Sequence, residues 1–378
     1  MMRAIPASLV VAALCLSAWI AWDFEAGARV LMLSLVGAPL VDWFLLKTLP
    51  RAASPPSSPA YPSRSLKYPS NGLAGLAYPS SSATSPHTVA LSLWLSLQLS
   101  LLAWALHAAS TRMVQGHQLA ELMLFVGMAN GIFGMTIAHE LLHRTGRTAY
   151  VVADALLMAA LYGHFRVSHL DVHHRLVATQ ADPATPTEGE TLYKFFGRSI
   201  VDGFALSLKI EAQRLAALGY RPHSLRNLAV RSLVAGVALI AMISSIFGAP
   251  AVVLFVGQAL IAVYTLEALN YVQHYGLSRR DSPDAQITSE GSLAWDWDGP
   301  FTNWLMLDLG AHNEHHGEPK TAKRGNCRIN PALRLPGSYL LMIAVASCPP
   351  LWRAIMDQRV RVFSSANAHG ASARFVDS

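Results

Sequence analysis

Six apolar runs constrain the fold of this 378-residue chain more than any other feature. Each is long enough for a helix to cross the roughly 30 Å of hydrocarbon in a bilayer. Charged residues make up only 14% of the chain, against roughly 25% in ordinary soluble proteins. We therefore predict an all-α, polytopic membrane protein that forms a single domain over residues 1–378. The six predicted spans are residues 4–22, 30–47, 88–107, 119–138, 232–249 and 251–272.

Shorter segments complete this plan. The apolar stretches AYVVADALLMAALYG and YLLMIAVASCPPLW fall below spanning length, so we expect re-entrant or interfacial pieces there. Residues 50–87 are rich in proline and serine, repeat YPS three times and cannot bury a core. This composition predicts a flexible loop. We expect residues 363–378 to form a disordered tail.

The net charge of +6 follows the predicted topology. If the first terminus is cytoplasmic, lysine and arginine concentrate in the inner segments 48–87 and 139–231 and after the last span. Only Arg29 and Arg112 remain outside, as the positive-inside rule requires. We therefore expect a bacterial-type inner membrane, with both termini and a histidine-rich helical cap in the cytoplasm. The positive charge needs no nucleic-acid partner.

Nine histidines fall into four short motifs, AHELLHR, VSHLDVHH, NYVQHYG and AHNEHH, beside the predicted spans. Three of these motifs contain two histidines four residues apart, a spacing that places both rings on one face of a helix. Such repeated pairs are typical of metal ligands. The candidate ligands are His139, His143, His169, His173, His174, His274, His312, His315 and His316.

The number of imidazoles indicates more than one metal ion. One ion takes about four protein ligands, so nine histidines fit two ions better than one. Imidazole suits iron, copper, zinc and nickel alike, and the ligand type leaves the metal open. An acid inside a membrane span, Glu267, is costly and needs a partner. Five residues near the motifs are candidates for supporting the ligands: Glu140, His164, Glu267, Asn270 and Tyr271.

The order HExxH, HxxxHH, NYxxHYG, HxxHH resembles the integral-membrane alkane hydroxylases and the xylene monooxygenases. These belong to the membrane fatty-acid desaturase and hydroxylase superfamily. The stretches YGHF, ATQADPATPTEGETLYKF, EAQRL, APLVDWFLL and PPLWRAIMDQRV are also similar to family sequence. The likeness covers most of residues 29–362.

This resemblance implies two iron ions held by the nine histidines, with O2 as co-substrate. It implies insertion of one oxygen atom into an unactivated C–H bond, such as the terminal methyl of an alkane, alkyl chain or methyl-arene. The apolar substrate would enter from the bilayer. Electrons would come from a rubredoxin or ferredoxin and its NAD(P)H reductase, because no fused redox domain is visible in this chain.

Some neighbours of the ligands depart from the family pattern. Ser168 replaces Glu, Leu170 and Val172 replace Asn and Gly, Gln273 replaces Glu, and Gly310–Ala311 replace Gln-Arg. Groups around metal ligands orient them and set their basicity. Because every ligand position is kept, we expect metal binding to survive, while the substrate and the reaction outcome depend on these changes.

Three other functions deserve comparison. The same iron site could desaturate or decarboxylate a fatty acyl chain, with Arg166 or Arg175 binding its carboxylate. A zinc protease built on HELLH would use Glu140 as base and Asp308 as a ligand, but seven histidines would then be unused. A metal transporter or store can carry histidine in low-complexity tracts, and here that loop contains only His87.

Overall fold

The computed structural model describes residues 40–42, 44, 86–144, 146–279, 293–307, 309–310, 312–313 and 330–376. Within them the regular structure is helical, apart from one isolated β-bridge between Asp296 and Arg334. The chain divides into two compact units. The first contains the described parts of Leu66–Val172 and Gly203–Leu266, and the second those of Val36–Ser65, His173–Asp202 and Glu267–Ser378.

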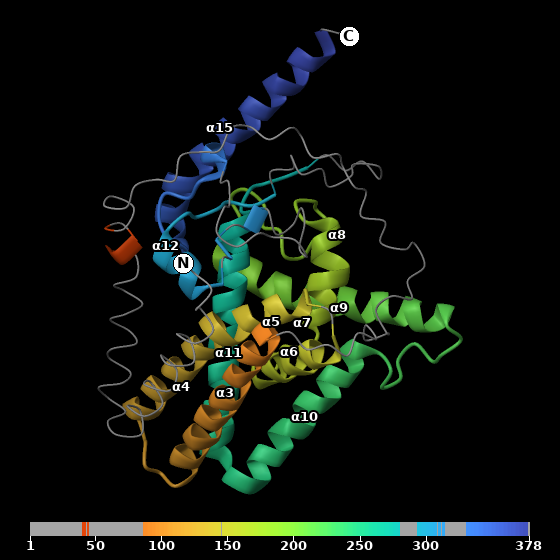
Figure 1. Cartoon of the computed structure of the whole chain (residues 1–378), viewed down its shortest axis with the longest axis vertical. Helices are drawn as coiled ribbons and strands as arrows, with labels where there is room; N and C mark the ends of the chain where they lie inside the picture. Colours follow the sequence, from red (N-terminus) through yellow and green to blue (C-terminus); the bar gives the residue numbers. More distant parts are fainter. Residues whose placement is uncertain are drawn as a thin grey trace. The chain divides into compact units, whose positions relative to one another are not determined.

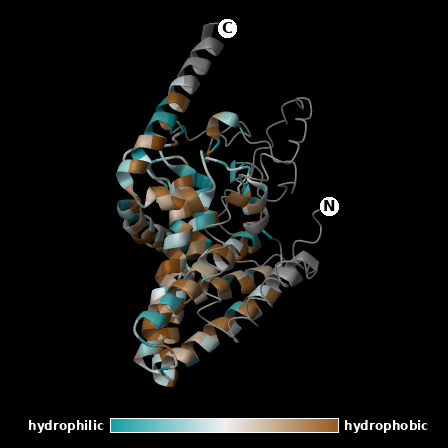
Figure 2. Cartoon of the chain, turned by 90° about the vertical axis from the view of Figure 1, so that its left-hand side faces the viewer, coloured by the Kyte–Doolittle hydropathy of each residue, from teal (hydrophilic) through white to brown (hydrophobic). Residues whose placement is uncertain are grey.

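Long apolar helices dominate the first unit. α3 packs against both α4 and α6 (Figure 1), and apolar residues prevail in the helices in the lower part of Figure 2. A π-helix, η1, interrupts the second long helix between α4 and α5. The elements are α3 (Pro86–Ser110), α4 (His117–Ala129), η1 (Asn130–Gly134), α5 (Met135–Leu142), α6 (Arg147–Ala159), α7 (Phe165–Val167) and α10 (Leu228–Phe247). Three helices cross the boundary between the units along the chain: η2 (Ser168–His173), α9 (Leu192–Ala217) and α11 (Ala249–His274).

Four helical segments are long and apolar enough to span a membrane: Leu93–Ser110, His117–Leu142, Leu228–Phe247 and Ala249–His274. They coincide with the last four predicted spans. Span 4–22 and most of span 30–47 lie outside the described residues, as does the loop at 50–87 up to the start of α3. The shorter apolar stretch AYVVADALLMAALYG, which begins at Ala149, forms most of α6. The polytopic, all-helical fold is therefore confirmed.

Glycines allow α4 and η1 to pack closely on α11. A Cβ at Gly127 would lie 2.6 Å from Ile261 Cβ, and one at Gly131 would lie 2.7 Å from Thr265 Cβ. The two glycines are four residues apart and share a helix face. This is the small-residue spacing by which membrane helices bring their backbones together.

A chain of amide side chains crosses the same helices. Gln98 Nε2 donates to Asn130 Oδ1 at 2.5 Å, and Asn130 Nδ2 donates to Gln258 Oε1 at 3.1 Å. Gln258 Nε2 in turn donates to the Ala159 carbonyl at 2.7 Å, where α6 ends. The three amides are buried. They satisfy one another and a helix-end carbonyl at a depth where unpaired polar groups are costly.

The second unit has helices of very different lengths and an aromatic core of Tyr271, Tyr275, Trp295, Tyr339 and Trp352. Its remaining elements are α8 (His174–Leu176), α12 (Pro300–Leu305), η3 (Pro331–Leu333), α14 (Tyr339–Ala346) and α15 (Pro349–Val376). α14 and the first part of α15 meet at 119° and make a broken span or a re-entrant segment. α15 runs helically to Val376, into the segment where we expected a disordered tail.

Candidate metal centre

Three histidines converge in the first unit and are named cluster 1: His139, His143 and His169. Their ligand nitrogens all lie within 4.8 Å of one another. The ring centroids of His139 lie 5.1 Å from His143 and 4.5 Å from His169, and His143 Nε2 lies 2.9 Å from His169 Nε2. The expected one-face pairing of His139 and His143 at the end of a helix is confirmed.

Three further histidines converge in the second unit and are named cluster 2: His173, His274 and His312. Their ligand nitrogens also lie within 4.8 Å of one another, and all three side chains are buried. The His274 ring centroid lies 4.8 Å from that of His173 and 5.2 Å from that of His312. Cluster 2 therefore brings together residues from three of the four sequence motifs.

His169 and His173 fall into different clusters, although their i, i+4 spacing predicted one face. His169 belongs to cluster 1 and His173 to cluster 2. The segment Ser168–His173 is a π-helix rather than an α-helix. Single π-turns within helices are frequent at functional sites, and this one supplies one ligand to each cluster.

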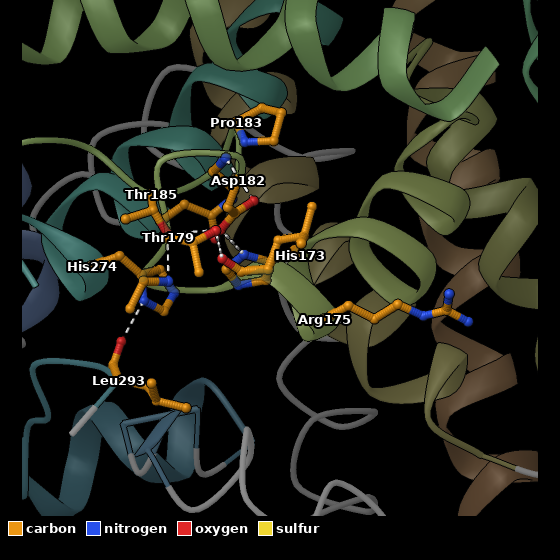
Figure 3. Close-up of polar contacts among 12 residues, drawn as sticks. His173, Arg175, Thr179, Asp182, Pro183, Thr185, His274 and Leu293 are labelled. Carbon is orange, nitrogen blue, oxygen red and sulfur yellow. Dashed lines mark hydrogen bonds and ion pairs between the residues drawn. The ribbon is translucent and has the colours of Figure 1, made fainter. Parts of the chain in front are cut away.

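A buried carboxylate orients His173. Asp182 Oδ2 lies 2.8 Å from His173 Nδ1 and accepts a hydrogen bond from Thr185 Oγ1, while Oδ1 accepts one from the Ala184 amide (Figure 3). Burial by itself raises the pKa of Asp182. The His173 ring and the hydrogen bonds from Thr185 and Ala184 together outweigh burial, and the pKa lies below its ordinary value. The ionised carboxylate holds hydrogen on Nδ1 and leaves Nε2 as the ligand atom.

The loop that carries Asp182 is anchored along its length. Arg198 donates to the carbonyls of Pro183 and Thr185 and to the Glu190 carboxylate. The hydrogen bonds to Glu190 raise the pKa of Arg198 above its ordinary value. Farther along the loop, Tyr271 Oη donates to the Glu190 carbonyl at 2.6 Å. These contacts fix the loop from both α9 and α11.

His274 is oriented by a backbone carbonyl. Its Nδ1 lies 2.7 Å from the Leu293 oxygen (Figure 3). A carbonyl only accepts hydrogen bonds, so Nδ1 carries the hydrogen and Nε2 is the ligand atom. Asn313, next to His312, accepts from the Leu293 amide at 2.9 Å and donates its own amide to Asp296 at 3.1 Å. Residues 293 and 312–313 are thereby tied to each other.

Gln273 and Gly310, where we expected departures from the family pattern, lie in the same region. Gln273 Nε2 donates to the Leu309 carbonyl at 3.4 Å, a contact that an ionised carboxylate could not make. A Cβ at Gly310 would overlap Asn303 Oδ1 and approach the Trp297 carbonyl at 2.5 Å. A larger residue at position 310 does not fit this arrangement.

The other predicted residues lie as follows. His174 is buried, and its ring centroid lies 6.0 Å from that of His173. It belongs to neither of the two groups whose ligand nitrogens lie within 4.8 Å of one another. His315 and His316 lie outside the described residues. Glu140 forms an ion pair with Arg144. Asn270 Nδ2 donates to buried Glu267 at 3.4 Å.

His164 is buried between Tyr162 and Phe204, at centroid distances of 4.6 and 5.2 Å. Burial lowers the pKa of His164 to about 4. Neither cluster includes it. The ring is therefore neutral and packed among aromatic side chains, in keeping with its expected place outside the ligand set.

Sequence reasoning missed Asp182 and the Leu293 carbonyl as partners of the ligands. A usable signal existed for Asp182, because it is an acid eight residues after the HH pair, within the family-like stretch ATQADPATPTEGETLYKF. A backbone carbonyl that follows a ligand by 19 residues leaves no mark in the side-chain pattern.

The fatty acid desaturase family model matches residues 116–323. This stretch is more than half of the chain and contains all nine candidate ligand histidines. The chain belongs to the fatty acid desaturase family. The all-helical fold and the two histidine clusters agree with that membership.

Relatives within this family confirm the resemblance to membrane hydroxylases. The chain is 32% identical to alkane 1-monooxygenase 1 of Pseudomonas aeruginosa, over 64% of this chain and 63% of that protein. It is 32% identical to alkane 1-monooxygenase 2 of the same organism, over 71% of each. It is 28% identical to XylM, the hydroxylase component of the Pseudomonas putida xylene/toluene monooxygenase, over 63% of each.

Both clusters fit a transition metal by the chemistry of their donors. Each offers three imidazole nitrogens within 4.8 Å of one another, and two rings of cluster 2 have their other nitrogen fixed by a carboxylate or a carbonyl. Ligating histidines are commonly held in this way. Neutral imidazole suits iron, the metal that the family resemblance implies.

Proposed function

We propose that this protein is an integral-membrane di-iron monooxygenase that hydroxylates an unactivated C–H bond. Its substrate would be the terminal methyl of an alkane, an alkyl chain or a methyl-arene. The reaction consumes O2, two electrons and two protons, and yields an alcohol and water. A rubredoxin or ferredoxin with an NAD(P)H reductase supplies the electrons at the cytoplasmic face of the inner membrane, where both termini also lie.

The observation that carries this proposal is the presence of two separate imidazole triplets, one in each unit of a membrane-spanning chain. One iron bound at each triplet would use both. The proposed full ligand set adds His174, His315 and His316 to the six clustered histidines. When bound, the iron ions supply the O2 reduction and C–H oxidation that no amino-acid side chain can perform.

The chain's own residues hold and shield the ligands. Asp182 binds Nδ1 of His173, and the Leu293 carbonyl binds Nδ1 of His274. In both rings Nε2 is therefore the nitrogen left to bind a metal ion. His139, His169, His173, His274 and His312 are buried, which limits access of bulk water. Most of α10 is exposed and apolar, so it contacts lipid, the phase in which an alkane dissolves.

Acyl desaturation or decarboxylation receives less support from the structure. Arg166 donates to Asp154 at 3.0 Å and lies 4.4 Å from the Tyr150 ring centroid, so neighbouring residues already engage it. Arg175 points away from His173 and His274 in Figure 3. The third member of the HELLH cluster is His169 rather than an acid, which also disfavours the protease.

The test is product analysis with membranes that contain the full chain. They are supplied with n-octane or p-xylene, rubredoxin, its reductase, NADH and 18O2. We expect the primary alcohol, carrying one labelled oxygen, and no alcohol from the matched His274→Ala membranes. An alkene without label would support desaturation instead. Absence of any product from both substrates, with the chain metal-loaded, would contradict the proposed substrate class.

A further inference from the structure

A second buried carboxylate, Asp42, holds a distant part of the second unit. Its side chain is 0% exposed. It accepts hydrogen bonds from Trp297 Nε1 at 3.0 Å, the Phe301 amide at 2.8 Å, the Thr302 amide at 3.1 Å and Thr302 Oγ1. One carboxylate therefore gathers four donors from residues 297–302, more than 250 positions later in the chain.

Asp42 takes the place of a missing cap on α12. Gly299 precedes this helix, and a glycine has no side chain that could accept a hydrogen bond from the first turn. The first amides of a helix have no partner within the helix, and Asp42 accepts from those of Phe301 and Thr302. A Cβ at Gly299 would collide with the Asp42 carboxyl group and the Trp297 indole, so glycine is required for this approach.

The same residues lead directly to cluster 2. The Trp297 amide donates to the Gly310 carbonyl at 3.0 Å, and Asn303 Nδ2 donates to the Trp297 carbonyl at 2.9 Å. Tyr339 Oη donates to the same Gly310 carbonyl at 3.3 Å. Gly310 is two residues before His312. The indole and backbone of Trp297 thus connect the Asp42 carboxylate to the segment that presents the ligand.

We propose that Asp42 is a positioning residue for cluster 2, holding residues 297–310 so that the His312 ring meets those of His173 and His274. A carboxylate suits this place because all four contacts come from donors. An asparagine would turn an NH2 group toward at least one of these donors. This inference rests on the proposed binding of metal by cluster 2.

The test uses the detergent-purified full chain, stripped of metal and titrated with Co(II), whose visible absorption reports its coordination. The variants are Asp42→Asn and Asp42→Ala, with His312→Ala as the loss-of-ligand reference. Glu211→Gln is the matched control. Glu211 is also a buried carboxylate that accepts from a first-turn amide, that of Leu228, but it lies in the first unit. Thermal unfolding of each variant reports whether it is folded.

We expect the wild type to bind two equivalents of Co(II). Changing an outer partner of a metal ligand typically weakens binding about 10- to 100-fold. Asp42→Asn should weaken one equivalent about tenfold and Asp42→Ala more, with the wild-type spectrum regained at high Co(II). His312→Ala should not regain it, and Glu211→Gln should match the wild type even where its melting temperature falls.

Wild-type affinity for both equivalents in folded Asp42→Asn would overturn the inference and leave the proposed function intact. The inference would also be overturned if Glu211→Gln weakened Co(II) binding as much as Asp42→Asn, because the effect would then reflect general destabilisation. A wild type that binds no Co(II) at cluster 2, shown by a titration that His312→Ala leaves unchanged, would overturn the metal site itself. Asp42→Asn decides the question if Asp42→Ala is not recovered folded.

Discussion

His173 Nδ1 lies 2.8 Å from Asp182 Oδ2, and both side chains are buried. This contact fixes the orientation of the imidazole and leaves its Nε2 available to a metal ion. It also gives the first prediction. Asp182→Asn should weaken metal binding at cluster 2 about 10- to 100-fold, because the neutral amide stabilises the Nδ1 hydrogen less well.

Competition for Fe(II) against a chromophoric chelator measures this affinity. Asp154→Asn is the control, because Asp154 pairs with Arg166 in the first unit. Equal Fe(II) affinity for wild type and Asp182→Asn would show that the carboxylate does not support the ligand.

Gly310 should not tolerate a side chain. Gly310→Ala would place a Cβ against Asn303 and the Trp297 carbonyl, and overpacking of this kind costs about 1–3 kcal/mol. We expect a lower thermal midpoint and a reduced iron content. Gly197→Ala in α9 is the matched control, because a Cβ added at Gly197 would have no atom within 4 Å. Equal midpoints for the two variants would show that the turn before His312 adapts freely.

The buried amide chain should contribute measurably to the stability of the first unit. Gln98→Leu removes the donor to Asn130, and side-chain hydrogen bonds in membrane proteins contribute about 0.6–2 kcal/mol. Gln115→Leu is the control, because Gln115 donates to the Arg112 carbonyl at an exposed site. Thermal unfolding in detergent should show a lower midpoint for Gln98→Leu alone. An equal midpoint for Gln98→Leu and the wild type would mean that this hydrogen bond adds no net stability.

His164 should make the protein sensitive to acid. Its pKa falls from an ordinary 6.5 to about 4 in the folded state, so the unfolded chain binds the proton more readily. The contribution to stability is complete above about pH 6.5 and decreases by up to about 3 kcal/mol as pH falls toward 4.

His164→Phe should reduce the loss of stability between pH 6.5 and 4, measured by unfolding midpoints across that range. His223→Phe, at an exposed loop position, should leave the pH profile unchanged. Identical profiles for wild type and His164→Phe would contradict a buried neutral ring at this position.

The apolar runs and the His139–His143 pair were predictable because both depend on local periodicity. A run of spanning length forms a helix in a bilayer wherever its neighbours lie. Two histidines four apart on an α-helix share a face, as these do. Local pattern was therefore enough for the four spans that lie within the described residues and for part of cluster 1.

The division of His169 and His173 between two clusters was not predictable from spacing. It accompanies a π-helical turn, and no residue type in SHLDVH marks such a turn. Asp42 was equally hidden, because its four donors lie more than 250 residues away. Long-range contacts of this kind depend on tertiary packing rather than on local pattern.

The most direct test of the central claim is the metal content of the detergent-purified chain, compared with His143→Ala and His274→Ala. If each cluster holds one metal ion, the wild type carries about two irons. Each variant should carry about one, because it lacks one of the three ligands of one cluster. The other cluster keeps its ion in each variant. One zinc per chain, lost in His143→Ala and retained in His274→Ala, would contradict the di-iron site and the oxygenase with it.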